Sequence, residues 1–367
     1  MKATAELHEL GQSIWLDNIT RELLDSGQLQ RYIEDYSVTG LTSNPAIFDK
    51  AIASGGYDEA IQDKAAKRPD HEALFFELAI EDLRRAADAF GSIHERTEGL
   101  DGWVSLEVSP LLAYDTETTV KVAKELHAQA ARPNLLIKIP GTAEGLPAIE
   151  EAIAAGVPVN VTLLFNADQY KAAAEAFMRG IERRVEAQED PIVDSVASVF
   201  MSRWDVAVQD KVEERLRDRL ALAVGLQVYQ TYRELMDSDR WGRLENSGAR
   251  MQRLLWASTS TKDPKAPDDL YLQSLGAPFT VNTVPEATLK AYYEHGHAAK
   301  PMPADGGDSQ ATLAEFADAG VDVDALAAKL QDNAAKSFVD AWNDLMAHID
   351  KQSASLGALN TATEGVR

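Results

Sequence analysis

Lys138 is the residue of this chain most suited to covalent chemistry, because it interrupts the short apolar run 135–139. A run of this length that stops at Pro140 and Gly141 is typical of a buried strand followed by a helix. A buried ammonium must find partners or lose its proton, and a neutral amine can attack a carbonyl carbon. The same residue could also extend its ammonium from the strand end to solvent, and this stretch alone does not separate the two interpretations.

Other polar residues lie inside or directly after apolar runs of the strand type. They are Asp17, Asn44, Glu107, Asn160, Thr162 and Ser198. Residues two apart in a strand point to the same side, so Asn160 and Thr162 share one face, as do Ser198 and Phe200. Buried strands favour Val, Ile and Leu, which makes polar side chains in them informative. Each has an ordinary explanation alone, such as a helix cap or a turn, but together they predict one polar cavity around Lys138.

The chemistry that this set suits is amine catalysis on a carbonyl compound. Asp17 and Glu107 are carboxylates in different surroundings, and two such groups can divide the general-acid and general-base roles. Burial favours a neutral lysine whereas a nearby carboxylate favours a charged one, and the sequence leaves open which effect is larger. We expect no metal and no cofactor, because the histidines lie away from the strand ends. His295 and His297 flank Gly296, which we interpret as the end of a helix.

A scaffold must bring these residues together from distant parts of the chain. Eight apolar runs have the length of strands, and each is followed by a stretch with helical spacing. They are residues 13–17, 38–42, 102–108, 135–139, 157–165, 194–200, 253–258 and 277–282. This alternation predicts an α/β fold, the (β/α)8 TIM barrel with additional helices, and catalytic groups at the C-terminal ends of its strands. A doubly wound sheet is less consistent with the sequence, because no Gly-rich turn follows the first strand.

We expect a single domain over residues 1–367. Its barrel core spans about 13–295, and a C-terminal helical extension covers about 308–350. Residues 351–367 are small and polar, which predicts a frayed tail. The stretch 205–239 is predicted to be one long helix between the sixth and seventh strands, and we interpret it as decoration of the barrel.

Composition restricts the partners of the protein. The net charge of −23 over 367 residues disfavours non-specific binding to nucleic acids or anionic membranes, which requires a basic surface. Cysteine is absent, which excludes disulfides and thiolate chemistry. No signal-peptide pattern stands at the start and no apolar stretch approaches about 18 residues, so we expect a cytoplasmic protein without a membrane span.

An anionic substrate would need a local cationic pocket in a chain of this charge. Arg203 follows the sixth strand, and the hydroxyl-rich segment from Ser258 to Lys262 follows the seventh. Loops after the late strands are the usual phosphate site of TIM barrels. These residues predict a phosphate site, although Arg203 could equally pair with one of the many acidic residues.

Four motifs stand in the order in which they occur in transaldolases. They are Thr-Ser-Asn-Pro at 42–45, Leu-Ile-Lys-Ile at 136–139, Asn-Val-Thr-Leu-Leu-Phe at 160–165 and Ser-Val-Phe-Met-Ser-Arg at 198–203. The chain therefore resembles the transaldolase family from Asp17 to about Asn282, in particular the long branch common in actinobacteria and other bacteria. The resemblance implies transfer of a dihydroxyacetone unit between phosphorylated sugars in the non-oxidative pentose phosphate pathway. The donors would be sedoheptulose 7-phosphate or fructose 6-phosphate, and the acceptors erythrose 4-phosphate or glyceraldehyde 3-phosphate.

The resemblance also implies a role for each residue at the strand ends. Lys138 would form a Schiff base with the donor ketone, and Asp17 would take the proton from its C4 hydroxyl during cleavage and return it on addition. Glu107, with Thr162 and a water molecule, would carry the proton transfers of imine formation and hydrolysis. Contacts to the substrate hydroxyls, the pocket wall and the phosphate are implied for Asn44, Asn160, Ser198, Phe200 and Arg203.

The chain departs from the short transaldolase branch after the seventh strand. That branch has a phosphate-binding arginine close to the position of Ser260, and Lys262 is the nearest cation here. Phosphate binding is therefore assigned first to Arg203, and second to Lys262 together with Ser258. The protein is expected to act as a monomer or a homodimer.

Two other functions remain open at this point. A simple class I aldolase would use the same lysine, but relatives with that activity are shorter and carry a glutamine and a tyrosine where Glu107 and Phe200 stand. A non-catalytic barrel would bind sugar phosphates without a covalent intermediate. A metal-dependent barrel hydrolase is disfavoured, because it needs histidines at the strand ends.

Overall fold

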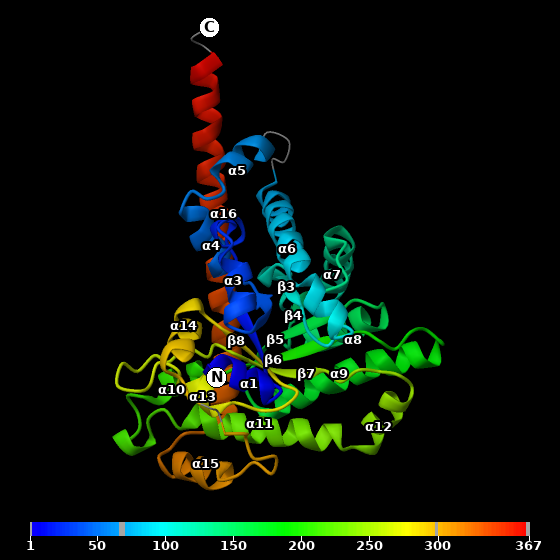
Figure 1. The fold of residues 1–367 in the computed structure, drawn as a ribbon, viewed down its shortest axis with the longest axis vertical. Coiled ribbons are helices and arrows are strands. Elements are labelled where there is room, and N and C mark those ends of the chain that lie inside the picture. The colour runs from blue at the N-terminus through cyan, green and yellow to red at the C-terminus, as the bar shows by residue number, and fades with distance from the viewer. Residues whose placement is uncertain (1, 66–69, 298–299, 365–367) are drawn as a thin grey trace.

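The chain folds into a closed barrel of eight parallel strands, and the computed structural model describes residues 2–65, 70–297 and 300–364 of it (Figure 1). Each strand pairs with its neighbours in sequence, and β1 closes the barrel on β8. The strands are β1 (Ser13–Asp17), β2 (Val38–Thr42), β3 (Val104–Glu107), β4 (Leu135–Pro140), β5 (Val159–Leu164), β6 (Ser195–Phe200), β7 (Arg253–Ala257) and β8 (Val281–Val284). The predicted TIM-barrel fold is confirmed.

The strands are buried on both faces, because helices cover the outside of the barrel and side chains fill its inside. All residues of β2 to β8 are buried. This double burial explains why the strands read as apolar runs rather than as alternating patterns. It also explains why a polar residue within a run points to the interior of the barrel or to its mouth.

Helices follow the strands and form the outer layer. Asn44, Asp115 and Asn166 each begin a helix by accepting a backbone N–H three residues later, which satisfies a free donor of the first turn. The helices up to β6 are α1 (Ala3–Glu9), α2 (Arg21–Asp25), α3 (Gln28–Asp35), α4 (Pro45–Ala53), α5 (Asp58–Ala65), α6 (His71–Arg96), α7 (Thr116–Ala130), α8 (Gly145–Ala154) and α9 (Ala167–Glu186). Those after it are α10 (Ser202–Val208), α11 (Leu220–Met236), α12 (Asp239–Asn246), α13 (Leu270–Ser274), α14 (Glu286–His295), α15 (Ser309–Asp318) and α16 (Val323–Glu364). Two 3-10 turns, η1 (Pro110–Leu112) and η2 (Glu214–Leu216), complete the elements.

Two stretches differ from the sequence prediction. The stretch 205–239 is not one helix, because α10 ends at Val208 and α11 begins at Leu220. Between them Asp218 has a φ of 56°, in the left-handed region that interrupts an α-helix. The eighth strand begins at Val281 instead of residue 277, because Phe279, with a φ of 59°, turns the chain just before it.

The C-terminal helix α16 lies across the end of the barrel at which the strands finish. Gln331 contacts backbone at the ends of β4 and β5, and further along the helix Trp342 packs edge-on against Phe75 of α6 at 5.2 Å. Figure 1 shows the helix continuing past α4 and α5. It runs to Glu364, where a frayed tail was predicted from residue 351.

Candidate active site

A cavity of about 450 Å³ opens at the C-terminal ends of the strands, where a TIM barrel places its reactive groups. Every residue that the sequence predicted for the site lines it, except Glu107. The predicted residues that line it are Asp17, Asn44, Lys138, Asn160, Thr162, Ser198, Phe200, Arg203, Ser258 and Lys262. Glu107 lies beneath the cavity surface and reaches the site through Lys138.

Lys138 lies in the middle of the site, and its side chain is only 7% exposed. Its Nζ donates to Oε2 of Glu107 at 3.0 Å and to the backbone carbonyl of Ser43 at 3.0 Å. The strand register explains the first contact, since Glu107 of β3 is paired with Lys138 of β4. The ammonium is therefore held inside the barrel and does not extend to bulk solvent.

Glu107 and Thr162 stand on the strands that flank Lys138, and each carries a buried oxygen with unused capacity. Oε1 of Glu107 and Oγ1 of Thr162 make no hydrogen bond to any residue that the structure describes. Burial raises the pKa of Glu107; Lys138 lowers it through its charge and hydrogen bond, and the charge of Asp17 raises it further. Buried oxygens of this kind need a partner, and a water molecule or a substrate group can supply it.

Asp17 ends β1 and faces the cavity from the side opposite β5. Its Oδ1 accepts a hydrogen bond from Oγ1 of Thr42 at 2.8 Å, and Thr42 in turn shares a hydrogen bond of 2.6 Å with Thr283. Burial raises the pKa of Asp17, while the charge of Lys138 and the bond from Thr42 lower it. A carboxyl group with a raised pKa holds a proton more readily than an exposed aspartate does, which suits it to accept and return one.

Asn160 and Ser198 form a hydrogen-bonded chain across three strands. Ser198 Oγ donates to Asn160 Oδ1 at 2.7 Å, and Asn160 Nδ2 donates to Ser105 Oγ at 3.1 Å. This chain fixes the orientation of the amide beside Lys138, whose strand register pairs it with Asn160. Asn44 is used differently, because its Oδ1 accepts the N–H of Ile47 and caps α4.

Two cationic side chains line the cavity from the segments that follow β6 and β7. The Arg203 guanidinium lies 5.4 Å from the ring of Phe200, and burial lowers its pKa. Lys262 Nζ donates to Ser260 Oγ at 2.5 Å, and Ser258 shares a hydrogen bond of 3.0 Å with Ser202. No acidic side chain of the described residues forms an ion pair with Arg203, whose side chain lines the cavity.

Several lining residues were not predicted from the sequence. Ser337, Phe338 and Ala341 come from α16, and Lys50 comes from α4. The Phe338 ring lies 6.0 Å from Lys138 Nζ. Nothing in the sequence separates an aromatic residue that faces a cavity from one that packs in a core, so only the packing of α16 identifies it.

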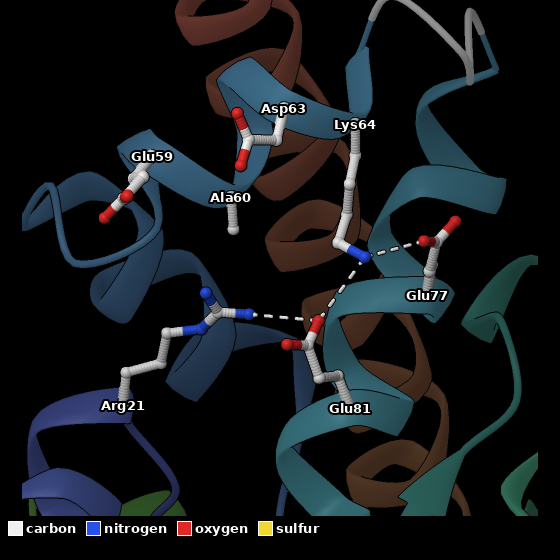
Figure 2. A pocket seen from close by; sticks show the side chains of 7 residues that line it. All are labelled: Arg21, Glu59, Ala60, Asp63, Lys64, Glu77 and Glu81. Atoms are coloured by element: carbon white, nitrogen blue, oxygen red, sulfur yellow. Dashed lines mark hydrogen bonds and ion pairs between the residues drawn. The ribbon is translucent and has the colours of Figure 1, made fainter.

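A larger cavity of about 680 Å³ lies away from the strand ends, between α2, α5 and α6 (Figure 2). Both cations of this cavity, Arg21 and Lys64, are already paired, as Figure 2 shows for Lys64, which lies 2.7 Å from Glu77 and 3.5 Å from Glu81. Arg21 lies 3.5 Å from Glu81 and 3.3 Å from the buried Asp82. No residue predicted for the site lines this cavity, and its ion pairs join helices of the outer layer.

Three further observations concern metal binding, the end of α14 and membrane spans. No cluster of three or more histidine and acidic side chains in them is arranged to hold a metal ion. Gly296 ends α14 directly after His295, as the sequence predicted. Within the same residues, no helix has both the length and the apolar character that crossing a bilayer requires.

Comparison with known proteins places the chain in a family. The family model described as transaldolase/fructose-6-phosphate aldolase matches residues 14–349. A transaldolase of Acidothermus cellulolyticus is 42% identical over 95% of this chain and 96% of that protein. Transaldolases of Thermobifida fusca (42% identical, 95% of this chain and 98% of that protein) and Neisseria gonorrhoeae (41%, 95% and 99%) are similarly related. The chain belongs to the transaldolase/fructose-6-phosphate aldolase family.

Proposed function

We propose that this protein is a transaldolase, which moves a dihydroxyacetone unit from a ketose phosphate to an aldose phosphate through a Schiff base on Lys138. The observation that carries the proposal is the position of Lys138. Its amine is buried between the Glu107 carboxylate and the Ser43 carbonyl, in a cavity that Arg203 and Lys262 also line. A buried, oriented amine is the nucleophile that a carbonyl substrate requires.

Imine formation begins when the neutral amine of Lys138 attacks C2 of the ketose. The nitrogen loses protons, the former carbonyl oxygen leaves as water, and a C=N bond forms. Glu107 lies 3.0 Å from this nitrogen, and its Oε1 is available for a water molecule shared with Thr162. We assign to these two residues the proton transfers of imine formation and of the later hydrolysis.

Carbon–carbon cleavage needs a base away from the nitrogen. Asp17 is assigned this role because it faces the cavity with a raised pKa. It takes the proton of the C4 hydroxyl, the C3–C4 bond breaks, and the electron pair moves into the protonated imine to give an enamine. The aldose phosphate leaves, an acceptor aldehyde takes its place, and the same carboxyl returns the proton to the new hydroxyl.

The remaining residues hold the sugar chain. Asn160 and Ser198 are oriented by their mutual hydrogen bond and can bind hydroxyls of the three-carbon unit, as can the free amide edge of Asn44. Arg203 is assigned to the phosphate, assisted by Lys262 and the Ser258 hydroxyl. The planar guanidinium can form two parallel hydrogen bonds to a phosphate. Phe200 forms the apolar wall beside it.

A class I aldolase is the second candidate, since the family model also carries that name. It would release dihydroxyacetone instead of passing it to an acceptor. Glu107 and Phe200 favour the transferase, because the aldolase relatives have glutamine and tyrosine at these positions. The two functions are separated by supplying fructose 6-phosphate with and without an aldose phosphate acceptor.

Borohydride reduction in the presence of fructose 6-phosphate tests the Schiff base directly. We expect a stable adduct on the peptide that contains Lys138, detected by its mass and unaffected by chelators. Lys138→Met should abolish the adduct, whereas Lys50→Met, at an exposed lysine of the same cavity, should retain it. An unmodified Lys138 under conditions where the sugar binds would refute the amine mechanism.

We further propose a cytoplasmic protein that acts on phosphorylated sugars as a monomer or homodimer. The net charge of −23 supports small anionic substrates held by a local cationic pocket over binding to nucleic acids or anionic membranes. Sedimentation and light scattering of the purified protein measure its assembly. Fractionation of cells measures its location, and recovery with a membrane or exported fraction would contradict the proposal.

A further inference from the structure

Helix α16 contacts the ends of two barrel strands through one side chain, Gln331. Its Nε2 donates to the carbonyl of Gly141, directly after β4, at 3.1 Å. The same nitrogen donates to the carbonyl of Leu163, the second-last residue of β5, at 2.9 Å. β4 carries Lys138, and Leu163 directly follows Thr162. Gln331 therefore joins the C-terminal helix to the two strands that present these reactive groups.

The backbone at the Leu163 contact departs from a regular sheet. Leu163 has a φ of 63°, and the register between β5 and β6 shifts between Val161 and Leu164. A bulge of this kind turns a peptide group out of the ladder and re-aims the neighbouring side chain. Leu163 is also buried, so its carbonyl needs a donor, which Gln331 supplies.

Gly141 completes the junction from the β4 side. Its N–H donates to the carbonyl of Thr162 at 2.7 Å, and a Cβ at this position would lie 2.4 Å from Leu164 Cδ2. The ends of β4 and β5 are therefore in close contact, and Gln331 of α16 donates to a carbonyl of each. Loss of the Gln331 amide would leave two carbonyls without this donor.

Two helical turns after Gln331, α16 places Phe338 over the site. The Phe338 ring centroid lies 6.0 Å from Lys138 Nζ and 6.3 Å from the ring of Phe200. Residues seven apart lie on the same side of a helix, and the buried Ala334 lies between the two. The hydrogen bonds of Gln331 therefore set where Phe338 stands relative to Lys138.

We propose that Gln331 is a positioning residue that holds α16 over the barrel mouth, keeps Phe338 beside Lys138 and thereby favours transfer over release of the three-carbon unit. The inference rests on the proposed Schiff base at Lys138. Before an acceptor binds, a proton from water can add to C3 of the enamine. Water then adds to the C=N bond, the amine leaves, and free dihydroxyacetone departs. The water released when the imine formed is thereby consumed. A closely held aromatic ring limits access of water to this intermediate.

The test compares two rates in the same enzyme preparation. One is transfer from fructose 6-phosphate to erythrose 4-phosphate, and the other is release of dihydroxyacetone without an acceptor. Gln331→Met keeps the length of the side chain and removes the donor, and Gln331→Ala removes both. We expect the ratio of release to transfer to rise by about tenfold, equivalent to about 1.4 kcal/mol, the scale of one or two net hydrogen bonds. Phe338→Ala should raise the same ratio, and combining it with Gln331→Met should add little.

Asn333→Ala is the matched control, because it removes a side-chain amide from an exposed position two residues along the same helix. Its ratio should equal that of the unchanged protein. Borohydride trapping on Lys138 separates the two levels of the proposal. No adduct in the unchanged protein would refute the Schiff-base function itself. An adduct with an unchanged ratio in Gln331→Met, or with both rates lowered in parallel, would overturn the role of Gln331 alone.

Discussion

Asp205 joins the segments that carry Arg203 and Lys262, the two cations proposed to bind the phosphate. It lies in α10, two residues after Arg203, and its Oδ1 accepts the N–H of Ala221 in α11 at 3.1 Å. Its Oδ2 accepts the hydroxyl of Tyr271 in α13 at 2.6 Å. α13 follows the loop that carries Lys262. The ionisation of this one carboxyl should therefore be visible in the stability of the fold around the site.

The direction of the effect follows from its pKa. Burial raises the pKa of Asp205 from 3.8 to about 6; the bonds from Tyr271 and Ala221 lower it, and the charge of Asp218 raises it further. The folded protein thus binds this proton more tightly than the unfolded chain does, and this contribution to the free energy of unfolding falls as pH rises from about 4 to above 6. The full difference is about 3 kcal/mol, at about 1.4 kcal/mol per pH unit.

Asp205→Asn removes the titration and keeps the shape. The asparagine Oδ1 can still accept the Ala221 N–H, and its amide nitrogen can donate to the Tyr271 oxygen. Urea unfolding from pH 4.5 to pH 7.5 measures both proteins. We expect the free energy of unfolding of the variant minus that of the unchanged protein to increase by about 2 kcal/mol between pH 4.5 and pH 7.5. This is less than the full difference, because part of the titration lies below pH 4.5.

Asp210→Asn provides the control, because Asp210 lies in the same segment and is exposed. Its free energy of unfolding should follow that of the unchanged protein at every pH. A difference between Asp205→Asn and the unchanged protein that stays constant from pH 4.5 to pH 7.5 would refute the reasoning. In that case the carboxyl would titrate alike in the folded and unfolded states.

Four further predictions address the site and its support. Asp17→Asn should slow cleavage of fructose 6-phosphate by about 10²–10⁴-fold in single-turnover assays. Borohydride should still trap the sugar on Lys138, and loss of trapping would contradict the assigned role. Arg203→Met should raise the KM for fructose 6-phosphate roughly 10- to 100-fold, because a charge-assisted hydrogen bond is lost, and should leave unphosphorylated fructose unaffected. Lys262→Met should have the smaller effect in the same assay, because its ammonium is exposed. Gly141→Ala should lower the free energy of unfolding in urea by about 1–3 kcal/mol through the clash with Leu164, and an equally stable variant would contradict the close packing there.

The strand ends of the barrel were the most predictable part of the protein. Lys138, Asn160 and Thr162 stand in runs that are buried on both faces, so each polar residue interrupts an apolar pattern and is easily recognised. Barrel topology then fixes where these residues meet, because parallel strands end at the same side. The part of the cavity lining that comes from the strand ends follows from these two facts, without knowledge of any long-range contact.

The contribution of α16 to the active-site cavity could not be predicted from the sequence. Its helical pattern is evident, but which turn of the helix lies over which strand depends on packing, such as Trp342 against Phe75. Gln331 contacts two backbone carbonyls, and the amino-acid sequence does not indicate which backbone groups a side chain will contact. The break in 205–239 was missed for a similar reason, since its residues favour helix and Asp218 departs from it only in the folded context.

In the proposed mechanism the two carboxylates of the site cannot exchange roles, although burial is the first cause of the raised pKa of both. Glu107 contacts the Lys138 nitrogen directly at 3.0 Å, whereas Asp17 is held by Thr42 and interacts with that nitrogen only through its charge. When a ketose binds, a protonated imine replaces the ammonium, so Glu107 keeps a cation beside it and remains able to serve the nitrogen through water. Cleavage instead requires a carboxyl that is not committed to the nitrogen and can hold a proton while the aldehydes exchange. Asp17 meets both conditions, which assigns the proton transfers at nitrogen to β3 and those at the carbon–carbon bond to β1.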